Sequence, residues 1–308
     1  MKITGNSEKP ELICNSLATR IVPSAPKISI VTPTFNAMAT LRETIESVLA
    51  QDYKNWEHIV MDGGSTDGTV DLLKGFPHLK WTSEKDHGHW HAMNKGIERA
   101  SGEIVAILNA DDCYREGALQ KVADAFVTHP EWDGLFGDIV YVDGESREIF
   151  RRAEACFDYD VLRFGNHCYV IHPTLFVRKS VYEKFGAYRY DKFLNSCDFD
   201  FILRLGRNRC RIGHIPFAVV NYRFHAHGQS ADRRVSSNMW KESLVIRKEH
   251  GRPDGIAGRV LQTVFRIKRQ LQKLIYRGRP DFIPGKWFLR KHMHDKTTFS
   301  SNVGVDKL

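Results

Sequence analysis

The stretch Ile104-Val-Ala-Ile-Leu-Asn-Ala-Asp-Asp112 decides the fold of this chain of 308 residues. Its first five residues are all apolar, a pattern typical of a strand that is buried on both faces of a sheet. An amide and two acidic side chains follow almost at once. The stretch therefore predicts a buried strand over residues 104–108 that ends in a turn with two adjacent carboxylates.

Strands and helices alternate around this stretch. Apolar runs predict strands over residues 28–31, 56–61, 79–82 and 135–142, and helical spacing predicts helices that begin at Leu41, Thr69, Trp90 and Glu116. Such alternation favours an α/β fold with a mostly parallel sheet flanked by helices. Thr40 and Glu43 have capping-box spacing, and Gly102 is placed to stop the helix over residues 90–100.

The pattern becomes irregular after Asp143. Short strands are expected near residues 175–177 and 215–221, and short helices over 180–185 and 198–207. Residues 255–280 hold seven basic and no acidic residues, with apolar residues at helical spacing. They predict a basic amphipathic helix over residues 256–279, within a C-terminal helical extension.

The net charge of +8 and the pI of about 9.1 suit three kinds of partner: nucleic acid, an anionic membrane or an anionic small molecule. The charge gathers in the C-terminal helix beside an apolar stripe, which favours peripheral contact with a membrane over nucleic acid. The alternative is a helix that packs its stripe on the domain and leaves its charges in water. The six cysteines form no C-x-x-C pair and we find no signal peptide, so reduced thiols in the cytoplasm are expected.

Three expected strands end in polar or acidic residues: Pro33-Thr-Phe-Asn36, Asp62-Gly-Gly-Ser65 and Asn109-Ala-Asp-Asp112. The carboxyl ends of parallel strands meet at one edge of a sheet, where ligands bind. Adjacent carboxylates repel one another unless a cation lies between them. Oxygen ligands suit Mg²⁺ or Mn²⁺, which complete their shells with substrate phosphates. Taken alone, Asp112 is equally well placed to cap the following helix.

Six motifs resemble, in their order and spacing, those of the family 2 glycosyltransferases of GT-A fold, of the kind that assembles bacterial polysaccharides. They are Val31-Thr-Pro-Thr-Phe-Asn36, Ser47-Val-Leu-Ala-Gln51, Asp62-Gly-Gly-Ser-Thr-Asp-Gly-Thr69, Ala92-Met-Asn-Lys-Gly96, Ser101-Gly-Glu103 and Leu108-Asn-Ala-Asp-Asp112. The resemblance is strong over residues 28–142 and weaker to about Ser230. It implies a polar lead-in (1–25), a catalytic domain (26–235) with nucleotide-binding (28–142) and acceptor (143–235) parts, and a basic helical extension (236–308).

The resemblance implies roles for the nucleotide-binding residues. Pro33, Thr34 and Asn36 match the first loop that contacts the nucleotide. Asp62 matches the aspartate that hydrogen-bonds the base, typically uracil. Asn109 takes the first place of the family's D-x-D motif, where a neutral amide can still bond ribose or a metal-bound water.

The resemblance also implies a metal site. Asp111 matches the carboxylate nearest to a Mn²⁺ or Mg²⁺ ion, and Asp112 would support it or contact the donor sugar. In the segment over residues 222–230, His225 would bind the metal or a phosphate, and Arg223 would pair with phosphate oxygens. A purely structural role is the alternative for His225.

Asp86, within Ser83-Glu-Lys-Asp-His-Gly88, matches the family's donor-sugar loop. Lys95 follows on the next helix, within reach of a phosphate, and the alternative is a solvated lysine. His91 stands where family members often carry an aspartate, which leaves the donor sugar open. His87, His89 and His91 straddle a glycine turn, so a zinc site is not expected.

Asp198, within Asn195-Ser-Cys-Asp-Phe-Asp200, matches the family's catalytic base, which takes a proton from the acceptor hydroxyl. The alternative for Asp198 is a helix cap or an ion pair. Asp200 would point elsewhere on a helix and pair with Arg204 at i+4.

The expected function is therefore transfer of a sugar, with inversion, from a nucleoside diphosphate sugar, in particular a UDP-sugar, to a hydroxyl of a saccharide or lipid-linked acceptor. One rival is a nucleotidyltransferase, which usually has a Gly-rich phosphate loop where this chain has Thr34-Phe-Asn36. Another is a non-catalytic nucleotide-sugar-binding protein. The presence of Asp111 and Asp198, which an active site would need, counts against it. The expected location is the cytoplasm, at the inner face of the membrane where the C-terminal helix binds lipid. No nucleic-acid partner is expected, and the oligomeric state stays open.

Overall fold

The structure, a computed structural model, describes residues 25–224 and 233–277. These residues form a nine-stranded sheet with helices on both faces. The strands are β1 (Ile28–Thr34), β2 (Trp56–Asp62), β3 (Lys80–Ser83), β4 (Ile104–Ile107), β5 (Cys113–Tyr114), β6 (Gly134–Val142), β7 (Glu148–Arg152), β8 (Leu175–Arg178) and β9 (Ile212–Arg223). The helices are α1 (Leu41–Leu49), α2 (Thr69–Lys74), α3 (His89–Arg99), α4 (Ala118–Thr128), α5 (Tyr159–Phe164), the 3₁₀ turn η1 (His172–Thr174), α6 (Lys179–Phe185), α7 (Cys197–Arg207), α8 (Arg233–Glu249) and α9 (Gly255–Arg277).

The strand order is β3-β2-β1-β4-β8-β6-β9-β5, with β7 beside β6. β3, β2, β1 and β4 are parallel to one another, whereas β8 is antiparallel to both of its neighbours. The predicted α/β class is confirmed. The sheet is parallel over the part that the sequence motifs cover and mixed beyond β4. One reason for the mixed part is the short turn between β6 and β7, because a turn of this length makes the second strand antiparallel to the first.

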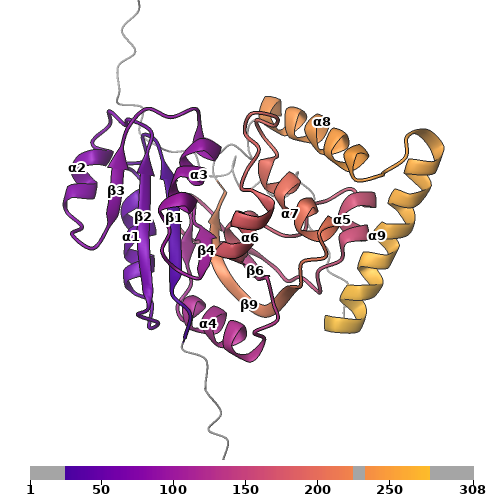
Figure 1. Cartoon of the computed structure of the whole chain (residues 1–308), viewed down its shortest axis with the longest axis horizontal. Coiled ribbons are helices and arrows are strands. Elements are labelled where there is room, and N and C mark those ends of the chain that lie inside the picture. The colour runs from indigo at the N-terminus through magenta and orange to yellow at the C-terminus, as the bar shows by residue number, and fades with distance from the viewer. Residues whose placement is uncertain (1–24, 225–232, 278–308) are drawn as a thin grey trace, which may run out of the picture.

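The strands place alternate side chains on the two faces of the sheet. Ile30 and Ala106 pack in a core with residues of α1 and α4, whereas Val31 and Ile107 pack in a core with residues of α3 and α7. Figure 1 shows the parallel strands at one end of the molecule and α8 and α9 at the other. Among the described helices, none has the length and apolarity needed to cross a membrane.

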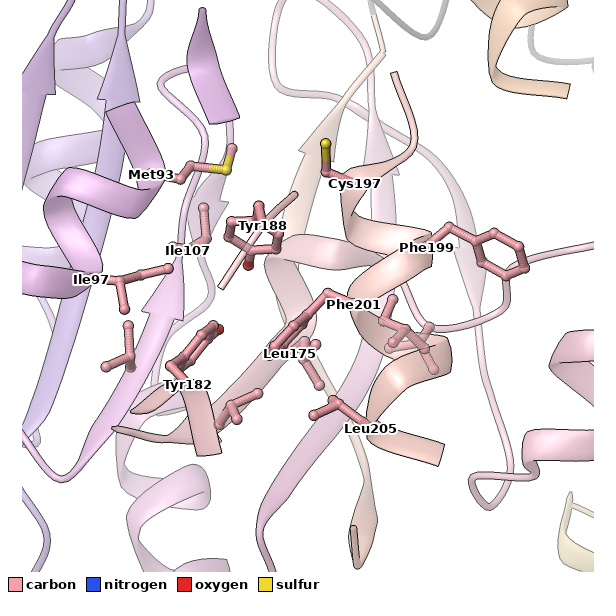
Figure 2. Packing of buried hydrophobic residues seen from close by; sticks show 14 of the residues in the cluster. Met93, Ile97, Ile107, Leu175, Tyr182, Tyr188, Cys197, Phe199, Phe201 and Leu205 are labelled. Carbon is pink, nitrogen blue, oxygen red and sulfur yellow. The ribbon is translucent and has the colours of Figure 1, made fainter. Parts of the chain in front are cut away.

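Aromatic rings build the core between α3 and α7 (Figure 2). Tyr182 stacks on Phe201 with 4.8 Å between ring centroids, and the Tyr188 ring meets Phe201 edge-on at 5.4 Å. Asn94 on α3 fixes the same region, because its side chain donates to the Tyr188 carbonyl at 2.8 Å and accepts the Tyr188 N–H at 3.0 Å. Asn94, the central residue of the motif over residues 92–96, therefore ties α3 to the segment whose Tyr188 ring packs on Phe201 of α7.

Two local expectations are wrong. Thr40 makes no side-chain cap bond to α1, and its N–H donates to the Ala37 carbonyl at 3.1 Å, so no capping box forms with Glu43. α3 ends at Arg99, before Gly102. Gly102 is needed for close approach to β1 instead, because a Cβ there would lie 2.6 Å from the carbonyl oxygen of Lys27.

We expect Gly102→Ala to lower the free energy of unfolding by about 1–3 kcal/mol, because the added methyl group would press on the backbone of β1. Gly144→Ala is the matched control, since a Cβ at Gly144 would meet no atom within 4 Å. It should change the same free energy by no more than about 0.5 kcal/mol. Urea unfolding followed by circular dichroism measures both, and equal stabilities would contradict the close approach at Gly102.

Candidate active site

The loop that follows β1 is ordered by the loop that follows β2. Asn36 adopts a positive φ of 49°, a conformation that Asn tolerates better than most residues. Its N–H donates to Ser65 Oγ at 2.7 Å, and its side-chain oxygen accepts the Thr66 N–H at 2.9 Å. The Met38 N–H donates to the Asp67 carboxylate at 3.0 Å. The predicted nucleotide-contacting loop is thus fixed by side chains of its neighbour.

Pro33 and Thr34 close β1 at the rim of the sheet. The register places Thr34 beside Asp62 of β2, and the Thr34 carbonyl accepts the Gly63 N–H at 2.9 Å. The Thr34 hydroxyl is buried and has no hydrogen-bond partner among the described residues. The ends of β1 and β2 therefore meet where the sequence predicts a nucleotide.

Asp62 is buried and orders the turn between β2 and α2. Its carboxylate accepts the N–H groups of Gly64 and Ser65, each at 3.0 Å, and the Ser83 hydroxyl at 2.6 Å. Ser83 lies at the end of β3, so three strand ends converge on one rim. The motif over residues 83–88 includes Ser83 but did not reveal its bond to Asp62, because that partner is set by the order of the strands.

The turn over residues 109–112 gives its two carboxylates different surroundings. Asp112 is buried, and it accepts the side-chain N–H of Asn109 at 2.9 Å and the backbone N–H of Arg223 at 3.0 Å. Burial raises the pKa of Asp112 well above its ordinary value, and the charge of Asp111 raises it further. Asp111 is partly exposed. The alternative that Asp112 caps a helix is wrong, because α4 begins only at Ala118.

Arg223, at the end of β9, clamps this turn. Its Nε donates to the carbonyl oxygen of Asp111 at 3.1 Å, and its Nη1 donates to the carbonyl oxygen of Gly144 at 2.9 Å. Its Nη2 bonds the carboxylate of Glu43 on α1. Arg223 is buried with these partners and positions the turn, and its expected pairing with a phosphate stays a prediction.

Thr40 and Glu43, the two residues with capping-box spacing, also hold the turn over residues 109–112 in place. The Thr40 hydroxyl donates to the carbonyl oxygen of Ala110 at 2.8 Å. Glu43 accepts from Arg223 and from the Ser146 hydroxyl, the latter at 3.0 Å. The sequence did not reveal these roles, because the Glu43 partner lies 180 residues away along the chain.

The predicted donor-sugar loop lies against the turn after β2. A Cβ on Gly63 would lie 2.9 Å from a carboxylate oxygen of Asp86 and 3.4 Å from the Phe35 ring, so these residues gather at the rim. Lys95 forms an ion pair with Glu84 at 2.9 Å, a partner that neither of its expected roles included. Asp86 thus lies close to the turn after β2, and Lys95 is paired with Glu84 of the predicted donor-sugar loop.

The histidines near this loop pack as aromatic rings. His87 and His91 approach with 5.0 Å between centroids, and His89 packs on Trp90 at 4.4 Å. Within residues 25–224 and 233–277, no three His, Cys, Asp or Glu side chains are grouped so as to hold a metal ion. His225, the second predicted metal ligand, lies outside the described residues.

Asp198 and Asp200 share the first turn of α7 and differ in their partners. Asp200 is fully buried and pairs with Arg189 and, at 3.0 Å, with Arg204, which confirms the predicted i+4 pair. Asp198 is partly buried and has no ion pair among the described residues. Burial raises the pKa of Asp198 to about 6, and the charge of Glu242 adds to this rise.

Helix α8, which the sequence predicted only as part of a helical extension over residues 236–308, supports the segment before Asp198. The Glu242 carboxylate accepts the backbone N–H of Leu194 at 3.2 Å and that of Asn195 at 2.9 Å. The Ser196 hydroxyl donates to a carbonyl oxygen of the same helix. Asp198 is therefore positioned by α8 as well as by the core between α3 and α7.

The ends of β1, β2 and β3 thus gather polar side chains at one rim of the sheet, which is where ligands bind in open α/β sheets. The sequence matches the model of Glycosyl transferase family 2 over residues 29–186, which is more than half of the chain. The chain belongs to this family, and the protein is a glycosyltransferase. This sets aside the nucleotidyltransferase and the non-catalytic alternatives.

Two relatives illustrate the similarity. The chain is 30% identical over 203 residues to a PGL/p-HBAD biosynthesis glycosyltransferase of Mycobacterium tuberculosis, covering 64% of this chain and 76% of the relative. It is 38% identical over 142 residues to the putative teichuronic acid biosynthesis glycosyltransferase TuaG of Bacillus subtilis, covering 44% of this chain and 56% of TuaG.

Solved structures confirm the GT-A fold. S. aureus TarS 1–349, in complex with UDP-GlcNAc, gives a TM-score of 0.55 at 17% identity, covering 82% of this chain and 76% of that one. The mannosyltransferase PcManGT from Pyrobaculum calidifontis, in complex with GDP-Man and Mn²⁺, gives 0.56 at 20% identity, covering 81% and 70%. The chain spans 43% of the length of TarS in its longer form. Identities this low establish the fold alone.

Arg223→Gln should lower the free energy of unfolding by about 1–3 kcal/mol and weaken UDP binding, because it leaves the carbonyl groups of Asp111 and Gly144 without their donor. Arg147→Gln is the matched control. Arg147 makes surface ion pairs and is 48% exposed, so its loss should change stability by less than about 1 kcal/mol. Urea unfolding and calorimetric titration with UDP measure both variants. If they behave alike in both measurements, Arg223 does not clamp the turn.

Proposed function

We propose that this glycosyltransferase moves a sugar, with inversion, from a UDP-sugar to a hydroxyl group of a saccharide or lipid-linked acceptor. The observation that carries the proposal is Asp198, a carboxylate on the first turn of α7 whose pKa is about 6. A base with this pKa is ionised at neutral pH and still holds a proton better than an ordinary aspartate.

In this mechanism Asp198 takes the proton of the acceptor hydroxyl while the hydroxyl oxygen bonds to the anomeric carbon. The bond from that carbon to the diphosphate oxygen breaks, and its electron pair leaves with UDP. A single displacement from the opposite face inverts the anomeric configuration. The chain contributes mainly by positioning the two reactants.

The rim of the sheet would hold the donor. The proposed nucleotide contacts are Pro33, Thr34, Asn36, Asp62 and Asn109, and the proposed donor-sugar contacts are Asp86, Lys95 and Asp112. Support comes from the mutual ordering of the first two loops and from the approach of Asp86 to Gly63. The TarS structures hold UDP and UDP-GlcNAc on the same fold and PcManGT holds GDP-Man, so the choice of a UDP-sugar rests on the match of Asp62 to the base-binding aspartate.

We further propose Mn²⁺ or Mg²⁺ as the cofactor, with Asp111 and His225 as ligands. The oxygen donors present fit such an ion: Asp111 is the more exposed carboxylate of the turn and lies beside a buried one. PcManGT holds Mn²⁺ with its nucleotide sugar. When bound, the cation would neutralise charge that develops on the departing diphosphate.

The relatives suggest the setting of the reaction. One is named for PGL/p-HBAD biosynthesis and another for teichuronic acid biosynthesis. We propose polysaccharide assembly for this chain, with the acceptor bound by residues of the 143–235 part. A lipid-linked acceptor would bring the reaction to a membrane surface.

Asp198→Asn should reduce the rate of sugar transfer by at least roughly a hundredfold while leaving UDP binding unchanged, because the amide cannot take the proton. In the wild type, the rate should fall as the pH drops through about 6, where Asp198 becomes protonated. Asp191→Asn, an exposed carboxylate in the same segment, is the control and should keep the wild-type rate. A transfer assay with a panel of UDP-sugars would test this, and retention of most of the rate in Asp198→Asn would exclude Asp198 as the base.

The same variant should be more stable than the wild type at neutral pH. The ordinary pKa of an aspartate is 3.8, so between pH 4 and 6 the folded chain holds a proton on Asp198 that the unfolded chain has lost. Stability therefore declines as the pH rises through this window and stays lower above it. Asp198→Asn removes this effect, which is on the order of 1–3 kcal/mol at pH 7 and absent below pH 4. A variant that is less stable than the wild type at pH 7 would indicate a structural carboxylate.

Removal of divalent metal should abolish release of UDP from the donor, and Mn²⁺ or Mg²⁺ should restore it. Asp111→Asn should raise the metal concentration needed for half-maximal activity by roughly tenfold or more, because it removes a charged ligand. Asp160→Asn, on the distant helix α5, should leave that concentration unchanged. Full activity in excess chelator would contradict the metal site.

A further inference from the structure

Helix α9 packs on the domain through its charged residues. Arg269 and Lys273 are only 7% and 2% exposed. Both bond Glu154, at 2.7 Å and 3.2 Å, and the Arg269 guanidinium lies 3.5 Å from the centroid of the Tyr169 ring. Although burial opposes ionisation of Glu154, the charges of Arg152 and these two residues hold its pKa at about 2.

Further polar contacts fix the same face of the helix. Arg277 pairs with Asp138 at 2.6 Å, and the Gln272 side chain donates to Asp158 at 2.7 Å. The helix is therefore attached along its C-terminal half by directional bonds. The rotation of α9 about its own axis is fixed by these bonds.

The opposite face of α9 is apolar and exposed. Its residues recur at a spacing that places them along one side of a helix. They are Ile256, Val260, Val264, Ile267, Leu271 and Leu274, and each is between 46% and 73% exposed. The alternative expectation, a stripe packed on the domain with its charges in water, is wrong. Figure 1 shows α9 at the outer edge of the molecule, beyond α5.

Basic residues border this stripe. Arg259 and Arg266 are exposed and lie seven residues apart, so they project from the same side of the helix. Neither forms an ion pair within the part of the chain that the structure describes. Lys268 lies at the other border and pairs with Asp158 at 2.7 Å. The helix contains no acidic residue.

We infer that α9 is a membrane-surface helix. Its apolar stripe enters the interface of an anionic bilayer, and Arg259 and Arg266 contact the lipid head groups. A long apolar face bordered by cations is the pattern of helices that lie in the membrane plane, and soluble monomers rarely expose so continuous an apolar patch. This inference goes beyond the proposed reaction, because it concerns a surface that takes no part in the chemistry.

A second copy of the chain fits this surface less well. Two α9 stripes packed on one another would bring the arginines of both helices together, and α9 offers no acidic residue to pair with them. Anionic lipid supplies the opposite charge. The charge of the helix thus selects the bilayer as its partner.

The test compares flotation of the full chain with vesicles of phosphatidylcholine alone and of phosphatidylcholine mixed with phosphatidylglycerol. The wild type should float with the anionic vesicles. Val264→Asp should weaken that binding at least roughly tenfold, because it removes an apolar side chain from the interface. Val245→Asp on α8 is the matched control, since Val245 is 49% and Val264 51% exposed, and it should bind as the wild type does.

Replacing both Arg259 and Arg266 by Gln should weaken binding to anionic vesicles roughly 30-fold, at about 1 kcal/mol for each charge. Equal flotation of Val264→Asp and Val245→Asp would overturn the inference, and so would a change of oligomeric state in Val264→Asp without a change in vesicle binding. UDP release measured without vesicles should be unchanged in Val264→Asp. This readout separates failure of the membrane contact from failure of the proposed reaction.

Discussion

Two adjacent carboxylates at the end of a buried strand are the constraint on which the candidate active site depends. Burial and the charge of Asp111 both favour the protonated form of Asp112. The turn remains in place because Asp112 accepts two hydrogen bonds and because donors from elsewhere hold the carbonyl groups of Ala110 and Asp111. Those donors are Thr40, immediately before α1, and Arg223, at the end of β9. The first helix and the last strand of the sheet are thus both required for the turn that follows β4.

The two carboxylates on the first turn of α7 also differ in their surroundings. Asp200 is buried and bonded to two arginines, whereas Asp198 is left without an ion pair among the described residues. In each acidic pair, one carboxylate is bonded by the protein and anchors the backbone, and its neighbour is the residue to which we assign a chemical role. An unpaired carboxylate in a desolvated position lowers stability. A residue with only a structural role would not retain that loss of stability. The penalty therefore favours the role that we propose for Asp198, a catalytic base, over the role of a helix cap.

Sequence patterns predicted the helices, strands and contacts that depend on residues close together in the chain. β1 and β4 follow from short apolar runs, and the pair of Asp200 with Arg204 follows from helical spacing. β7 was not predicted, and α8 was predicted only as part of a helical extension, because charged residues interrupt their apolar positions. Thr40 and Glu43 have the spacing of a capping box, yet their partners are fixed by tertiary contacts that no spacing reveals. The resemblance identified Asp198 but gave no account of its support, because Glu242 lies on a helix that joins it only in the folded chain.

Helix α9 is held in place in the same way as the active-site turn, by cationic side chains that bond oxygen atoms of other elements. Glu154, Asp138 and Asp158 present carboxylates on the surface that receives the helix, and cations or polar donors must meet them. Buried ion pairs add little net stability compared with apolar packing, but they are directional, whereas apolar contact is not. A helix docked by its apolar stripe would be free to adopt several rotations and would present charge to solvent. Docking by ion pairs fixes one rotation, and the apolar residues then face outward as a consequence of the charges beneath them.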